Sequence, residues 1–163
     1  MKERMIPSTC PHCGHVFQIK RDTVVIAGMN PTIDKRLNQG TYFTHECQLC
    51  HHLYYIEQPF LYRDPDKKYI LLLSNQKEIN NLPKDEEVIR CKNALQFLFC
   101  YKVKSQGLNI SLVLKKKRQL EKKFAKPVRF DCWDEKHACL WFWVDQDCIA
   151  TLLNTEESKQ IKG

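Results

Sequence analysis

Along the first half of the chain, apolar and β-branched residues come in short runs bounded by turn-forming residues, which is typical of β-strands. Residues 16–26 are rich in β-branched side chains, and we expect one or two strands there. Further strands are predicted at 41–45, 53–62 and 69–73, of which the last two form a hairpin around the turn at 64–68. The nine residues before Cys10 have no convincing strand pattern.

One segment in this half has the end signals of a helix. Asn30 is a natural N-cap, Pro31 takes the first helical position, and Gly40 supplies a stop. We therefore expect a short helix between residues 30 and 40.

The pattern of the second half begins with two amphipathic helices. Acidic residues at 85–87 precede apolar residues spaced three or four apart from Val88 to Val103, which predicts a helix that ends near Gly107. Over residues 108–124, apolar side chains fall on one helical face and basic side chains on the other, with Lys117 as the exception.

Three predicted strands follow, over residues 128–133, 138–144 and 148–153. A turn centred at 135–136 would place Cys132 opposite Cys139 on an apolar face. Residues after Asn154 are expected to be frayed.

Two thiol pairs add candidate chemistry to this pattern. Cys10 and Cys13 are separated by two residues, as are Cys47 and Cys50. Such turns point both sulfurs at one ion, and two of them supply the four thiolates of a tetrahedral zinc site. Four sulfur ligands close the coordination shell, so we expect one structural Zn²⁺ that does not activate water.

The strands and helices are partly segregated along the chain, which favours the α+β class. The predicted architecture is a zinc-ribbon-like β lobe followed by two helices and a C-terminal antiparallel β-meander. We place a boundary in the polar segment 74–84, with one lobe over residues 1–82 and a second over residues 83–163, packed together as one unit.

Composition narrows the class of protein. The chain has 163 residues, 43% hydrophobic and 28% charged, which is enough to bury a core in an ordinary folded protein. No apolar run resembles a signal peptide or reaches the roughly 18 residues of a membrane span, so no membrane association is expected. Nine cysteines without a secretory signal favour a reducing cytoplasm over a disulfide scaffold.

The net charge of +7 is unevenly distributed. Residues 85–130 carry twelve basic and four acidic side chains, whereas residues 131–163 carry three and seven. The candidates for contacts with nucleic-acid phosphates are Lys115, Lys116, Arg118, Lys122, Lys123 and Lys126, with Lys102 and Lys104. A solvated face or a contact with a protein is the alternative, since no aromatic residues are interleaved for stacking on bases.

Other interpretations of the cysteines remain open. One thiolate could be replaced by a nearby histidine, namely His12, His15, His45, His51 or His52. Cys10-Pro11-His12-Cys13 is also a tetrapeptide of oxidising thiol–disulfide oxidoreductases, but there it follows a core strand and begins a helix, and a second pair has no role. Cys132 and Cys139, with His137 nearby, are either buried thiols or a second metal site.

Several landmarks occur in one order along the chain. They are Cys10-Pro11-His12-Cys13-Gly14, Asn30-Pro31, Leu37-Asn38-Gln39-Gly40, Thr41-Tyr42-Phe43, the second CxxC pair and Leu61-Tyr62-Arg63-Asp64-Pro65-Asp66-Lys67-Lys68. This order resembles the CpXC domain family of bacterial and archaeal proteins over roughly residues 8–125. The resemblance implies that Cys10, Cys13, Cys47 and Cys50 are zinc ligands, and it implies no activity. Gln48 and His51 stand where the family usually has proline and glycine.

These observations predict a zinc-stabilised binding or regulatory module, not an enzyme, that acts through an unidentified protein partner. A nucleic-acid-binding regulator that uses the face from Lys115 to Lys126 is the alternative, and an oxidoreductase at Cys10 and Cys13 is a more remote one. No catalytic residue and no small-molecule substrate are predicted, because a P-loop, a G-x-S-x-G motif and a dinucleotide fingerprint are missing. Tyr62 and Asp64 are interpreted as parts of a structural turn.

Overall fold

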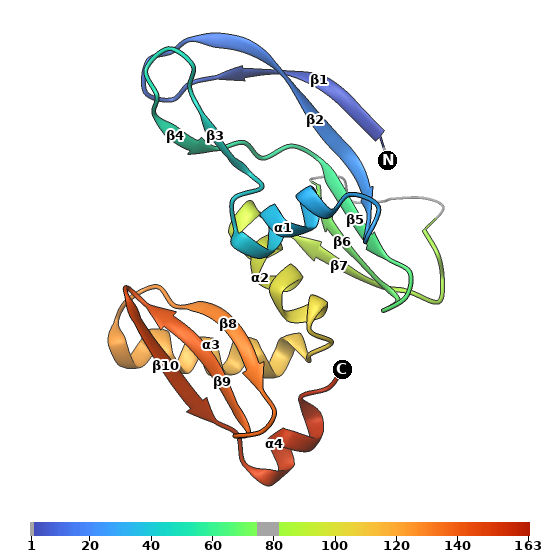
Figure 1. The fold of residues 1–163 in the computed structure, drawn as a ribbon, viewed down its shortest axis with the longest axis vertical. Coiled ribbons are helices and arrows are strands. Elements are labelled where there is room, and N and C mark those ends of the chain that lie inside the picture. The colour runs from blue at the N-terminus through green and yellow to red at the C-terminus, as the bar shows by residue number, and fades with distance from the viewer. Residues whose placement is uncertain (1, 75–81) are drawn as a thin grey trace. The chain divides into compact units, whose positions relative to one another are not determined.

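The computed structural model describes residues 2–74 and 82–163, which form two compact units (Figure 1). Unit 1 is Met1–Leu98 and unit 2 is Phe99–Gly163. Both units contain helices and strands, which confirms the α+β class. The segment 74–84 lies largely outside the described residues, so the division at residue 82 and the packing of two lobes as one unit stay predictions.

The main element of unit 1 is a five-stranded mixed sheet with the order β1-β2-β5-β6-β7. Pairs β1–β2 and β5–β6 are antiparallel, and pairs β2–β5 and β6–β7 are parallel. The strands are β1 (Lys2–Thr9), β2 (Val16–Ile26), β5 (Phe60–Asp64), β6 (Tyr69–Leu73) and β7 (Glu87–Cys91).

Two of these strands differ from the predictions. No strand was expected before Cys10, yet β1 pairs with β2 along its whole length, because the partner strand and not its own pattern stabilises it. The helix expected from residue 85 begins only at Ala94, in α2 (Ala94–Ser105), and Glu87–Cys91 is a strand. Parallel pairing of β7 with the fully buried β6 outweighs the helical spacing of its apolar residues.

The helix α1 (Pro31–Gln39) has the predicted ends. The Asn30 side chain accepts hydrogen bonds from the amides of Thr32 and Ile33, and Gly40 ends the helix at φ 78°. A two-stranded sheet follows, formed by β3 (Thr44–Glu46) and β4 (Leu53–Tyr55). The predicted hairpin therefore consists of β5 and β6 alone, since the residues of β4 pair with β3.

An aromatic cluster forms part of the core of unit 1. Phe43 contacts the rings of Tyr42, Phe60 and Phe97 edge-on, at centroid distances of 5.1, 5.9 and 5.5 Å. Phe43 directly precedes β3, so this core lies at the base of the small β3–β4 sheet.

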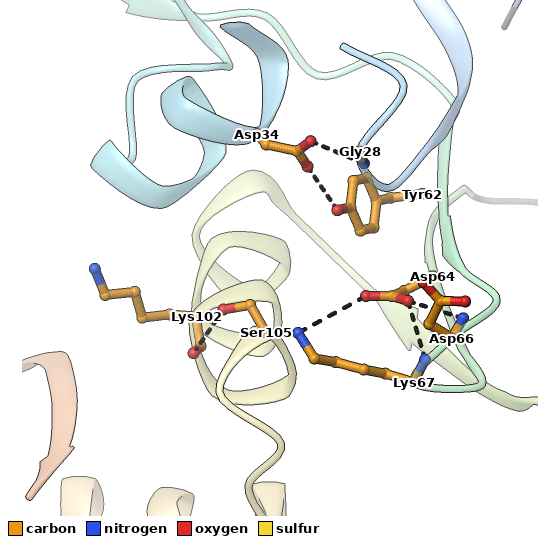
Figure 2. Close-up of polar contacts among 8 residues, drawn as sticks. All are labelled: Gly28, Asp34, Tyr62, Asp64, Asp66, Lys67, Lys102 and Ser105. Atoms are coloured by element: carbon orange, nitrogen blue, oxygen red, sulfur yellow. Dashed lines mark hydrogen bonds and ion pairs between the residues drawn. The ribbon is translucent and has the colours of Figure 1, made fainter. Parts of the chain in front are cut away.

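Tyr62 and Asp64 anchor local structure (Figure 2). The Tyr62 hydroxyl donates to Asp34 of α1 over 2.6 Å, and the same carboxylate accepts from the Gly28 amide. Asp64 Oδ1 accepts from the amides of Asp66 and Lys67, as expected for the first residue of a turn. The interpretation of Asp64 as a turn residue is confirmed.

Unit 2 packs one helix on a three-stranded antiparallel sheet of order β10-β9-β8. Leu112, Val113 and Leu120 of the helix share a buried cluster with Leu140 and Phe142 of the sheet. The elements are α3 (Ile110–Phe124), β8 (Arg129–Asp134), β9 (Cys139–Val144), β10 (Asp147–Leu152) and α4 (Thr155–Gln160).

Two predictions for unit 2 are wrong in detail. Cys132 lies opposite Trp141 and not Cys139, because the β8–β9 turn spans residues 135–138 instead of two residues. The residues after Asn154 are not frayed. They form α4, whose start has a capping box between Asn154 and Glu157, and Ile161 beyond it is 1% exposed.

None of the helices in the described ranges is both long and apolar enough to cross a bilayer.

Candidate metal centre

Each CxxC pair lies at the turn of a β-hairpin, which we call a knuckle: knuckle 1 joins β1 to β2 and knuckle 2 joins β3 to β4 (Figure 1). The backbone of both knuckles has the same two hydrogen bonds. In each, the first cysteine donates to the carbonyl five residues on and accepts from the amide four residues on. The bonds are Cys10 N to His15 O (2.9 Å), Gly14 N to Cys10 O (2.9 Å), Cys47 N to His52 O (3.0 Å) and His51 N to Cys47 O (2.9 Å).

The fold brings the four sulfurs of the two knuckles together. All four lie within 4.8 Å of one another, with Cys10 Sγ 3.6 Å from Cys50 Sγ and Cys13 Sγ 3.7 Å from Cys47 Sγ. A tetrahedron of metal–sulfur bonds of about 2.3 Å has edges of about 3.8 Å, whereas a disulfide bond is only about 2.05 Å long. The four cysteines therefore fit a metal ion, and they are not joined as disulfides.

The sulfurs compete for negative charge. The amides of Cys50 and Leu49 lower the pKa of Cys47 to about 6. The His52 amide acts in the same direction on Cys50, but burial and the three neighbouring sulfurs raise the pKa of Cys50 to about 12. Four crowded thiols do not all ionise unless a cation lies among them, which is what a metal ion supplies.

The family comparison agrees with this geometry. The sequence profile of the family described as CpXC protein matches residues 8–127, well over half of the chain. The chain belongs to the CpXC family. The matched range includes both knuckles and extends through α3 of unit 2. No curated protein and no solved structure gives a significant match.

The alternative ligand sets find no support in the CpXC structure. Among the described residues, only the four knuckle cysteines form a group of three or more potential ligands close enough for one ion. His12 instead stacks on His52 with the ring centroids 4.9 Å apart, and His137 contacts Asp134 over 2.8 Å. Cys139 is buried, which agrees with the interpretation as a core thiol, whereas Cys132 is only half-buried.

The surroundings of Cys10 and Cys13 differ from the expectation at one point. A strand, β1, does precede Cys10. However, no helix follows the pair, because β2 begins at Val16. The helix N-terminus that acidifies the reactive thiol in those enzymes is therefore missing at this site.

The CpXC knuckles differ at one backbone position. Gly14 of knuckle 1 has φ 76°, and His51 at the equivalent place in knuckle 2 has φ 62°. A left-handed conformation costs a residue with a side chain about 1 kcal/mol or more. We expect His51→Gly to raise the free energy of unfolding by about 0.5 kcal/mol, after the greater freedom of glycine in the unfolded chain is subtracted.

Urea denaturation of metal-loaded protein measures this effect. Gly14→Ala is the matched variant, because it places a side chain at the same backbone conformation, and it is expected to destabilise the protein by about 1 kcal/mol. Loss of stability in both variants would show that the imidazole of His51 contributes more than its backbone strain costs.

Some of the predicted basic residues are buried or ion-paired, and the others are exposed. Lys116 is buried with its Nζ 2.9 Å from Glu157 of α4, so its assignment to the exposed face is wrong. The reason is that α4, expected to be frayed, lies against that side of α3. Lys104 is also buried, and Lys126 pairs with Asp145 over 2.6 Å. The exposed basic residues of α3 are Lys115, Arg118, Lys122 and Lys123.

Sequence reasoning missed the role of Glu157. Its Oε1 accepts from the Asn154 amide, and its Oε2 contacts Lys116. The spacing Asn154-x-x-Glu157 is itself a helix-start signal, so it could have predicted α4 from the sequence.

Proposed function

We propose that this CpXC protein is a zinc-stabilised binding module that docks another protein, and that it is not an enzyme. The observation that carries the proposal is the group of four thiols within 4.8 Å of one another. Zinc is the usual metal of a tetrahedral four-cysteine site, and with all positions taken by sulfur it acts as a structural ion. Thiolates must stay reduced to bind it, which favours the cytoplasm.

The surface proposed for docking consists of exposed apolar side chains beside the knuckles. Val16 and Leu53 are each the third residue after the last cysteine of a knuckle, and Leu49 lies inside knuckle 2. Their exposed fractions are 61%, 61% and 66%. Large apolar side chains held on rigid turns are typical of protein-binding surfaces, because little conformational entropy is lost on docking. We call these three residues the knuckle surface.

A capture experiment with variants of the knuckle surface tests this function. Full-length protein with Leu49→Asp and Leu53→Asp is expected to retain about a tenth or less of a partner that the unaltered chain captures from nuclease-treated extract. Leu152→Asp is the matched control, since Leu152 is 73% exposed but belongs to unit 2. Quantitative mass spectrometry compares the three samples. Equal capture by all three proteins would refute docking at the knuckles.

A further inference from the structure

One face of α3 carries exposed cations that form no ion pair with the residues that the structure describes. Lys115, Arg118 and Lys122 are spaced by three and four residues, so they form one stripe along the helix, and Lys123 lies beside it. All four side chains are exposed, and within the described ranges none has a carboxylate at ion-pair distance. We call these four residues the α3 cationic face.

The acidic residues that contact this region are held by lysines outside the face. Glu157 pairs with Lys116 and Glu121 with Lys117, at 2.9 and 3.1 Å. Asp145 pairs with Lys126. The positive charge of the α3 cationic face is therefore available to a partner outside the chain, which favours a polyanion.

The shape of this face suits an extended polymer. An open hollow of about 450 Å³ lies along it, lined by Ser111, Leu114, Lys115, Arg118, Gln119 and Lys122. All lining residues come from α3, so the hollow has no second wall that would enclose a small molecule. The opposite side of α3 packs on the sheet of unit 2 through Leu112, Val113 and Leu120, which fixes the helix as a rigid presenting element.

We propose that the α3 cationic face binds duplex DNA with α3 in the major groove. The groove of B-form DNA is about 12 Å wide and accepts an α-helix of about 10–12 Å diameter, whereas the major groove of duplex RNA is too narrow. The lysines and Arg118 neutralise phosphates, and Gln119 and Ser111 are side-chain types that contact base edges.

Single-stranded nucleic acid fits the face less well. The lining of the hollow contains no aromatic ring on which unpaired bases stack.

DNA binding by α3 is independent of the proposed protein docking at the knuckles, because α3 belongs to unit 2 and the knuckles to unit 1. Either function can therefore be refuted without the other.

Fluorescence anisotropy with a labelled DNA duplex and the full-length protein tests the proposal. If the four cations each neutralise one phosphate, the slope of log K against log salt is about −3.6, and affinity falls about a hundredfold between roughly 50 and 200 mM salt. The triple variant Lys115→Gln, Arg118→Gln, Lys122→Gln is expected to reduce the slope to about −0.9 and to weaken binding by more than tenfold.

The matched control removes the same charge from exposed positions elsewhere in unit 2: Lys136→Gln, Lys159→Gln, Lys162→Gln. Its slope and affinity are expected to be those of the unaltered chain. Equal DNA binding by the two triple variants overturns the proposal, as does tighter binding to duplex RNA or to an acidic polypeptide than to duplex DNA. If the first triple variant loses its thermal unfolding transition, the single variant Arg118→Gln tests the proposal instead. Its salt slope is expected to be shallower by about 0.9, and an unchanged slope would contradict DNA binding by the α3 cationic face.

Discussion

If the four cysteines hold the proposed zinc ion, its chelation is expected to unfold the two knuckles together with β3 and β4, and to leave unit 2 folded. The strands β3 and β4 have three residues each, and their side chains are exposed or only half-buried. The knuckle residues that are fully buried are the candidate ligands Cys10 and Cys47. Apparent binding free energies of roughly 10–16 kcal/mol are typical of structural zinc, which exceeds what so little apolar burial contributes.

Hydrogen exchange and fluorescence separate the two parts of this prediction. Amides at 10–17 and 44–55 are expected to lose protection on chelation, while those of the buried strand β6 keep it. All three tryptophans of the chain lie in unit 2, so tryptophan emission reports on that unit and is expected to stay unchanged. Metal analysis before chelation should give one zinc ion per chain.

Two serine variants provide the comparison. Cys47→Ser removes a ligand and is expected to abolish stoichiometric zinc binding and the protection of β3 and β4. Cys148→Ser changes an exposed thiol of unit 2 and should alter neither. A metal-free protein in which β3 and β4 remain protected would show that the four thiols do not stabilise the fold through an ion.

The parts of the fold that could be predicted are those with local signals. The ends of α1 follow from Asn30 and Gly40, whose backbone and side-chain contacts involve only residues of that helix. The CxxC spacing likewise predicts the position of each knuckle in the sequence from a few neighbouring residues. To predict that the two knuckles lie close together, it is enough to assume that their four thiolates share one ion. The candidate ligands can therefore be named from the sequence without any distances.

The parts that could not be predicted depend on distant partners. β1 has mostly exposed side chains and takes its conformation from β2, and β7 is fixed by its parallel neighbour β6. The β2–β5 pair joins Val24 to Leu61, which lies 37 residues further along the chain. No local periodicity encodes such pairings, because β1 and β7 have irregular or helical patterns when taken alone, and the strand patterns of β2 and β5 do not specify a partner.

In the candidate basic face, the burial of one residue, Lys116, also depends on a distant partner and could not be predicted from the local pattern. The helical wheel places Lys116 at the border between the basic and the apolar side of α3. Whether a border residue is exposed depends on what packs beside the helix, and here α4 supplies Glu157. The helical wheel therefore predicts correctly that four basic residues are exposed, namely Lys115, Arg118, Lys122 and Lys123. It cannot show that Lys116 is buried and lies outside this exposed face.

Loss of the Glu157 carboxylate is expected to destabilise unit 2 by about 3 kcal/mol. Glu157→Ala removes one half of the capping box and leaves the Lys116 ammonium, whose side chain is 11% exposed, without its partner. Removing one member of a buried ion pair typically costs about 3–5 kcal/mol, because the remaining charge stays desolvated. Urea denaturation followed by tryptophan emission measures this effect in unit 2. Glu121→Ala is the control, since Glu121 pairs with Lys117 at a more exposed position and its loss should cost less than about 1 kcal/mol.

The pH dependence of stability distinguishes the charge of Glu157 from its packing. Lys116, and then the Asn154 amide, lower the pKa of Glu157 in the folded protein below its ordinary value. A carboxyl with a lowered folded-state pKa stabilises the protein above its unfolded-state pKa, and this contribution is lost as the pH falls through the folded-state value. The stability difference between the unaltered chain and Glu157→Gln should therefore be largest at neutral pH and shrink in acid. A difference that is constant with pH would mean that Glu157 stabilises α4 by shape and hydrogen bonding alone, and that the ion pair with Lys116 adds nothing.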